Sequence, residues 1–224
     1  KSNRRQKSLD DFIICFWTNS NMIKLYSKDN PIERIQKVVD VLNSGGVIIY
    51  PTGMTYALGC HALKERAVEC ICKIKQVNPA AHNLSVVCYD MSSISEYAHI
   101  STPVYKLMKR NLPGAFTFIL PGKNKLPKIF RKRKSNEIGI QMPDNPILRD
   151  ILEVLNAPLM TASLPISVDQ DLNELIDPEL VNEKYESVVD MVIDGGVGQE
   201  GASTVVDCLG EDYQIIRQGK GVLI

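Results

Sequence analysis

The sequence has few of the residues that hold metals or cross-link small secreted proteins. It contains six cysteines and three histidines among 224 residues, and no two cysteines are spaced as a CxxC pair. Cys70 and Cys72 are two positions apart on a predicted helix, so their side chains point to different faces. This pattern argues against a structural zinc site. It is typical of buried, reduced thiols in a cytosolic protein.

A hydrophobic run long enough to span a bilayer is also missing. The longest apolar run, near residues 12–17, is far too short to cross a membrane. Asp10 and Asp11 interrupt its basic lead and no small-residue cleavage site follows, which argues against a signal peptide. We therefore expect a cytoplasmic protein without membrane contact. We interpret residues 1–21 as an upstream or artificial N-terminal extension and residues 22–224 as one domain.

The chain lacks an excess of either charge, since 26 basic residues balance 26 acidic ones. The net charge thus gives no argument for nucleic-acid binding. Residues 123–134, however, hold seven basic residues and no acid. Such a run could follow a nucleic-acid backbone, which makes Arg131, Lys132 and Arg133 weak candidates for RNA binding. Phe130 is its only stacking group, and a solvated loop is the alternative interpretation.

A Ser/His/Asp triad, a Walker loop and a dinucleotide fingerprint are all missing. What the chain does show is an alternation of strand and helix patterns, with extra strands near its end. This order predicts an α/β fold with a mixed parallel and antiparallel sheet flanked by helices. Residues 53–60 and 164–177 are interpreted as loops between these elements.

The most informative strand is predicted at residues 47–50, where an apolar run ends at Pro51. Thr52 follows it, and the ends of strands in open α/β sheets are where ligands bind. The Thr52 hydroxyl could hold a polar ligand, or it could bond its own turn backbone. Lys73 and Lys75 end a predicted helix over residues 64–75. Either they complement the helix C-terminus or they contact phosphate.

Three further hydroxyls occur inside or at the ends of predicted strands. Thr117 follows a Pro-Gly turn, Ser163 ends a strand and Ser203 opens one after several glycines. Glycine-rich turns can expose backbone N–H groups to anions, although without a Walker pattern this signal is weak and a loose surface loop is the favoured interpretation of the segment before Ser203. Near the C-terminus, Arg217 lies two positions before Gly219. It could bind phosphate, or it could belong to a frayed chain end.

Taken in order, seven stretches resemble the YrdC/YciO family. They are GGVIIYPTGMTYALGC, ICKIKQ, KRNLPGAFTFILPG, IGIQMPDNPI, PLMTASLP, ASTVVDC and IIRQGKG. The resemblance covers residues 23–221, and the third stretch is most similar to the YciO branch. It implies a single YrdC-like domain with a twisted sheet around one large, positively lined cavity.

The resemblance also implies an activity, because the family includes the threonylcarbamoyl-AMP synthases. These enzymes join threonine, bicarbonate and ATP, release pyrophosphate and supply the N6-threonylcarbamoyl modification of adenosine 37 in transfer RNA. The expected ligands are therefore ATP with Mg²⁺, threonine and bicarbonate, with transfer RNA or double-stranded RNA as a macromolecular partner.

Residue roles follow from the same motifs. The resemblance makes Lys75 and Ser163 catalytic residues that contact the nucleotide, and it adds Thr117 and Arg217 to the nucleotide-binding set. It assigns Thr52 and Ser203 to threonine.

Four positions depart from the family pattern. Val77 stands where the phosphate motif has arginine, Gln141 replaces another arginine, Pro165 replaces an asparagine, and Gly53 replaces an acid. The sequence thus leaves two hypotheses: an ATP-using synthase, or a catalytically weakened YciO-like protein that binds nucleotide or double-stranded RNA.

Overall fold

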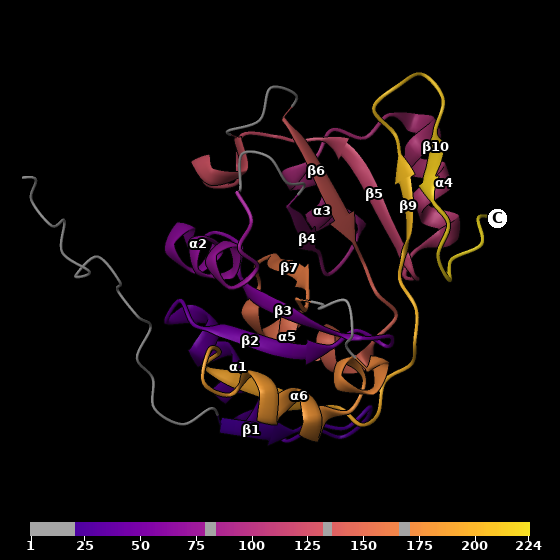
Figure 1. Ribbon diagram of the computed structural model, residues 1–224. Helices are drawn as coiled ribbons and strands as arrows, with labels where there is room; N and C mark the ends of the chain where they lie inside the picture. Colours follow the sequence, from indigo (N-terminus) through magenta and orange to yellow (C-terminus); the bar gives the residue numbers. More distant parts are fainter. Residues whose placement is uncertain (1–20, 79–83, 132–135, 166–170) are drawn as a thin grey trace, which may run out of the picture.

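The computed structural model describes residues 21–78, 84–131, 136–165 and 171–224 (Figure 1). The described residues form ten strands in a single sheet, in the order β1-β8-β2-β3-β7-β4-β6-β5-β9-β10. The strands are β1 (Asn21–Lys24), β2 (Val47–Pro51), β3 (Tyr56–His61), β4 (Ser85–Val87), β5 (Phe116–Pro121), β6 (Glu137–Gln141), β7 (Leu159–Ser163), β8 (Met191–Asp194), β9 (Thr204–Asp207) and β10 (Gln214–Arg217).

The sheet mixes both strand directions, as the sequence predicted. Four pairs are parallel, namely β1 with β8, β2 with β8, β4 with β6 and β5 with β9. The pairs β2 with β3, β3 with β7, β4 with β7, β5 with β6 and β9 with β10 are antiparallel. Figure 1 shows the strands turning strongly from β1 at the bottom to β10 at the upper right, as the twist of each strand requires.

Helices cover this sheet in places. They are α1 (Ile32–Asn43), α2 (Glu65–Ile74), α3 (Met91–Tyr97), α4 (Thr102–Asn111), α5 (Pro146–Leu155) and α6 (Pro178–Tyr185), with short 3₁₀ helices at Lys128–Arg131 and Leu172–Leu175. Helices α1 and α5 pack together against β2, α2 packs on β3, and α6 packs on β8. Two buried clusters result: a smaller one beneath α1 and α5, and a larger one that includes the apolar face of α2.

Helix boundaries follow from the local sequence. Pro31 precedes α1 without any cost in lost hydrogen bonds, because the first N–H groups of a helix have no partner in it. Gly45 then ends α1 with φ of +87°, a conformation that glycine adopts without strain. At α5 the side chain of Asn145 accepts a hydrogen bond from the Leu148 N–H, which caps the helix.

Two loop predictions were wrong. Residues 56–60 lie in β3, every residue of which is buried between β2 and β7; the predicted loop is only Thr52–Thr55. Within residues 164–177, the described part holds a 3₁₀ helix, and Leu164 and Leu175 are buried in the larger core. Burial of the apolar side chains in these segments is favourable in free energy, and an exposed loop would lose that contribution.

The predicted division of the chain at residue 22 remains a prediction, since residues 1–20 lie outside the described part. The first strand begins at Asn21, beside that boundary. Among the helices of the described residues, none combines the length and the apolar character that a membrane crossing would need.

Candidate functional site

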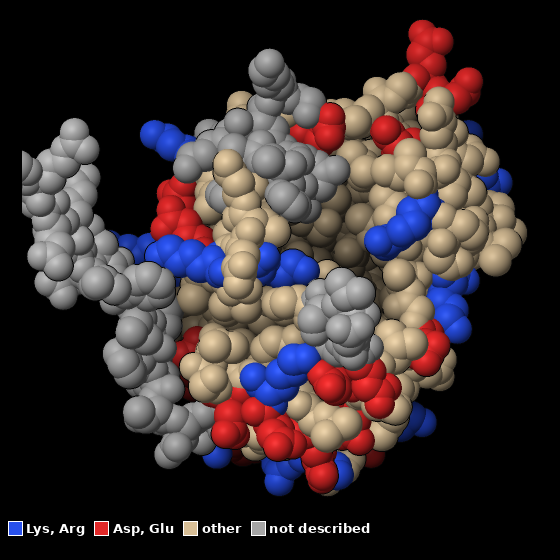
Figure 2. Space-filling view, viewed as in Figure 1, with Lys and Arg blue, Asp and Glu red and all other residues tan. Residues whose placement is uncertain are grey.

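A cavity of about 600 Å³ opens where the strongly twisted middle of the sheet separates two walls. The end of α2 and the end of β7 contribute to one wall, while β5, the start of β9 and the end of β10 contribute to the other. The space-filling view shows the hollow near the centre of the face, with blue Lys and Arg side chains on both sides of it (Figure 2).

The hairpin loop Thr52–Thr55 joins β2 to β3 and borders the cavity. The Thr52 hydroxyl donates a hydrogen bond to the Thr55 carbonyl (2.7 Å) and accepts one from the Met54 N–H (3.2 Å). Its observed contacts are therefore those of the turn hydroxyl that we considered as the alternative. Gly53 has φ of +88°, which explains why glycine suits the position where the family pattern has an acid.

Lys75 and Ser163 meet on one wall although they are 88 positions apart. Lys75 follows the last residue of α2, and Ser163 is the last residue of β7. The Lys75 ammonium donates a hydrogen bond to Ser163 Oγ over 3.0 Å. Partial burial lowers the pKa of Lys75, because a less polar surrounding disfavours the charged form. The pair presents a cation and a hydroxyl side by side in the cavity.

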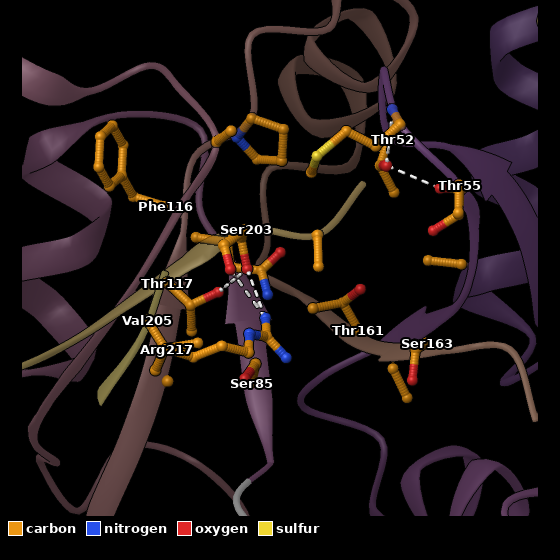
Figure 3. A pocket seen from close by; sticks show the side chains of 18 of the residues that line it. Thr52, Thr55, Ser85, Phe116, Thr117, Thr161, Ser163, Ser203, Val205 and Arg217 are labelled. Atoms are coloured by element: carbon orange, nitrogen blue, oxygen red, sulfur yellow. Dashed lines mark hydrogen bonds between the residues drawn. The ribbon is translucent and has the colours of Figure 1, made fainter. Parts of the chain in front are cut away.

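Thr117, Ser203 and Arg217 form a second polar cluster on the opposite wall (Figure 3). Thr117 Oγ1 and Ser203 Oγ lie 2.7 Å apart. The Arg217 guanidinium donates to the Ser203 carbonyl (2.9 Å) and to Ser203 Oγ (3.3 Å). Parallel pairing of β5 with β9 brings Thr117 and Ser203 together, and β10 adds Arg217. All six main site candidates from the sequence thus line one cavity.

The charged residues of the lining are few. Among the described lining residues, Lys75 and Arg217 are the cations and Asp144 is the acid. Val77 and Gln141, two of the positions that depart from the family pattern, also line the cavity and add no charge. Fixed positive charge is therefore confined to one point on each wall, within the described part of the chain.

Sequence reasoning missed several polar lining residues. Ser85 on β4 and Thr161 on β7 lie opposite each other in the antiparallel ladder, and both line the cavity. Gly139 neighbours Ser85 on β6, and a Cβ there would collide with Ser85 Oγ, so glycine leaves room for that hydroxyl. Thr161 could have been found from the two-residue spacing to Ser163, which places both on one face of a strand. Ser85 had no local signal.

A metal held by protein ligands alone does not fit this site. Within the described residues, no group of three His, Cys, Asp or Glu side chains is placed to hold an ion. Asp144 is the carboxylate that borders the cavity. Mg²⁺ typically keeps several waters and binds through substrate phosphates with one or two carboxylates, so Mg²⁺ would enter here with a nucleotide.

Two of the three predicted RNA-binding residues lie outside the described part of the chain. Arg131 ends a short 3₁₀ helix, whereas Lys132 and Arg133 fall in the undescribed segment. The prediction for these three residues therefore stays a prediction.

The family model described as "Telomere recombination", which represents the Sua5, YciO and YrdC proteins, matches residues 40–219. The chain belongs to the Sua5/YciO/YrdC family. This confirms the resemblance that the sequence motifs predicted.

Individual relatives agree with this assignment. The uncharacterized protein YciO of Escherichia coli K12 is 37% identical over 194 residues, covering 86% of this chain and 93% of the relative. A putative threonylcarbamoyl-AMP synthase of Methanocaldococcus jannaschii is 32% identical over 211 residues, covering 91% of this chain and 94% of the relative.

Solved structures show the same fold. The crystal structure of E. coli YciO aligns with a TM-score of 0.82 at 33% identity and covers 91% of this chain and 97% of its own. The P. abyssi Sua5 structure, a complex with L-threonine, aligns with a TM-score of 0.80 at 24% identity and covers 89% of this chain and 58% of its own. This likeness to Sua5 supports the fold.

Proposed function

We propose that this protein is an ATP-using L-threonylcarbamoyladenylate synthase-like enzyme that contributes to N6-threonylcarbamoyladenosine formation in transfer RNA. The observation that carries the proposal is the pair of polar clusters that face one cavity. Lys75 with Ser163 lies on one wall, and Arg217 with Thr117 and Ser203 lies on the other. The name of the M. jannaschii relative supports the activity, and the threonine bound to P. abyssi Sua5 supports the amino-acid substrate.

The proposed reaction requires control of phosphate charge. Threonine and bicarbonate give a carbamate and water, and one carbamate oxygen then forms a bond to the α-phosphorus of ATP. The bond from that phosphorus to the bridging oxygen breaks, and pyrophosphate leaves. Lys75 and Arg217 would stabilise the phosphate oxygens, where charge develops. Mg²⁺ bound to the phosphates would neutralise further charge, with Asp144 as the available carboxylate.

The cavity would also protect the intermediate. A carbamate loses carbon dioxide readily in water, so holding it against the phosphorus raises the effective concentration of the nucleophile. A pocket of about 600 Å³ falls within the usual range of small-molecule sites. Ser163, Thr117 and Ser203 would supply neutral hydrogen bonds that orient the two substrates.

The test is pyrophosphate release from ATP with threonine, bicarbonate and Mg²⁺ present and each omitted in turn. Synthase chemistry predicts release that depends on both threonine and bicarbonate, and mass spectrometry should then detect threonylcarbamoyl-AMP. Lys75→Ala should lower the rate at least tenfold, whereas Lys73→Ala should not, because Lys73 is exposed on the same helix and does not line the cavity. Pyrophosphate release at the same rate with and without threonine would contradict the proposal.

A second candidate function is nucleotide binding without efficient turnover. It is favoured by the neutral Val77 and Gln141 in the cavity lining, because each arginine contact to phosphate is typically worth a few kcal/mol. ATP binding by calorimetry without pyrophosphate release would select it. Binding of double-stranded RNA through Arg131, Lys132 and Arg133 belongs to this second candidate.

A further inference from the structure

A buried tyrosine hydroxyl lies directly behind the cavity wall. Tyr50 on β2 is 1% exposed, and its Oη lies 2.7 Å from Oγ1 of Thr161 on β7. Thr161 is 6% exposed and lines the cavity. Among the described residues, Tyr50 Oη has no other hydrogen-bond partner than Thr161. The phenol thus connects the core beneath α1 and α5 to a polar group of the site.

Gly59 makes this contact possible. Strand β3 lies between β2 and β7, and Gly59 on β3 is directly opposite Thr161 in the ladder. A Cβ on Gly59 would lie 2.8 Å from Cε1 of the Tyr50 ring, closer than side-chain carbons pack. The ring therefore crosses the intervening strand at the position that has no side chain, and the hydroxyl reaches Thr161.

Burial decides which hydroxyl donates in this pair. A phenol has one proton to donate, and leaving a buried donor without an acceptor costs about 1–3 kcal/mol. If Thr161 donated to Tyr50, the phenol proton would have no acceptor among the described residues. Tyr50 therefore donates, and Thr161 Oγ1 accepts. Burial also raises the pKa of Tyr50, so the phenol keeps its proton at neutral pH.

The consequence lies on the cavity side of Thr161. Because its oxygen accepts the phenol proton, its own proton is free to point elsewhere, and its exposed edge faces the cavity. Within the described residues, no other protein group bonds to the Thr161 hydroxyl. Figure 3 shows Thr161 on the same wall as Ser163, across the cavity from Ser203 and Arg217.

We propose that Thr161 is a ligand-contacting residue that donates a hydrogen bond to an oxygen atom of the substrate, and that Tyr50 is the positioning residue that fixes this polarity. The acceptor would be a carboxylate, carbamate or phosphoryl oxygen, and this choice of ligands rests on the proposed function. A neutral donor at this place adds orientation without adding charge.

The test compares four variants by calorimetry with ATP and with L-threonine as separate probes. Thr161→Val should lower the affinity for one of the two probes about 3- to 10-fold, as expected for the loss of one neutral hydrogen bond. Tyr50→Phe should lower the affinity for the same probe. The double variant should bind that probe with the same affinity as Thr161→Val alone. Thr161→Ser keeps the hydroxyl and should bind within about twofold of wild type.

Tyr97→Phe is the matched control for loss of a phenol hydroxyl. Tyr97 is largely buried on α3 and does not line the cavity, so its variant should keep wild-type affinity whatever it does to Tm. A purely structural role of Tyr50 predicts a lower Tm for Tyr50→Phe with both affinities unchanged, which would overturn the inference.

Two other outcomes also decide the question. An additional loss of affinity when Tyr50→Phe is combined with Thr161→Val would show that Tyr50 does not act through Thr161. If wild-type protein binds neither probe, the proposed function fails together with this inference. If wild-type protein binds a probe and the Thr161→Val and Tyr50→Phe variants bind it with the same affinity, the inference alone fails.

Discussion

At the scale of single residues, the cavity depends on two cations that stand on different walls. Lys75 bonds Ser163, and Arg217 bonds Ser203, but within the described residues neither cation pairs with a carboxylate. An unpaired cation beside a hydroxyl retains its charge for an anionic ligand. The partly buried charge of Lys75 lowers the stability of the fold and favours the binding of an anionic ligand, and both effects can be measured.

The use in binding predicts the effect of Lys75→Ala. Loss of the ammonium should weaken ATP binding about tenfold or more, which corresponds to about 1.4 kcal/mol. Calorimetry measures the affinity, with Lys73→Ala as the matched control on the same helix. An unchanged affinity in Lys75→Ala would remove this lysine from the site.

The cost in folding predicts the effect of Lys75→Met. Burial lowers the pKa of Lys75 in the folded state, so between that value and its ordinary pKa near 10.4 the unfolded chain binds more protons. The free energy of unfolding therefore rises with pH through this window. At pH 7 we expect the methionine variant to be the more stable one, with an advantage that shrinks as the pH approaches 10. Urea titrations at several pH values measure it, and a pH-independent difference would contradict the argument.

At the scale of elements, the site depends on strand register. Thr161, Ser85 and Gly139 lie side by side on β7, β4 and β6, while Thr117 lies on β5 and Ser203 directly precedes β9. A shift of one residue would turn these side chains to the other face. Glycines at Gly59 and Gly139 keep the space that neighbouring side chains fill.

Packing around Gly59 predicts the effect of Gly59→Ala. The added Cβ would lie 2.8 Å from Tyr50 Cε1 and 2.9 Å from Leu159 Cδ2. Overpacking of this kind costs about 1–3 kcal/mol, which lowers the Tm of a domain of this size by about 2–12 °C. Calorimetry measures the Tm. Gly210→Ala is the control, since a Cβ there meets no atom closer than 3.5 Å and should change stability by at most about 0.5 kcal/mol.

At the scale of the whole molecule, charge is distributed unevenly although it sums to zero. Residues 123–134 gather seven basic side chains, while residues 169–190 gather eight acidic ones. Electrostatic attraction to a nucleic-acid backbone depends on such local clusters rather than on net charge. Any contact of this protein with RNA should therefore be concentrated at the basic run.

This distribution predicts a change in salt dependence. If the basic run binds RNA, replacing Arg131, Lys132 and Arg133 by Gln should flatten the plot of log affinity against log salt by about two to three units of slope, because each lost phosphate contact releases about one counterion fewer. Fluorescence anisotropy with a double-stranded RNA at several salt concentrations measures it. The same slope in wild type and variant would return the run to a solvated loop.

Local sequence was sufficient for much of this molecule. Apolar patterns and turn residues predicted the alternation of strands and helices and the mixed sheet, because hydrophobic periodicity is a local property. The ordered motifs predicted the family and named six residues that line the cavity. Local sequence failed at β3, because every residue of this strand is buried and no alternation of polar and apolar residues marks it in the sequence.

Tertiary structure alone decided how these residues meet. The pairing of β7 with β3 and β4, and of β5 with β9, joins positions that are far apart in the chain. These contacts place Ser163 beside Lys75 and Ser203 beside Thr117. Ser85, Thr161 and the buried phenol of Tyr50 entered the site in the same way. Sequence determines which strands form, but the twist and register of the sheet determine which hydroxyls share a cavity.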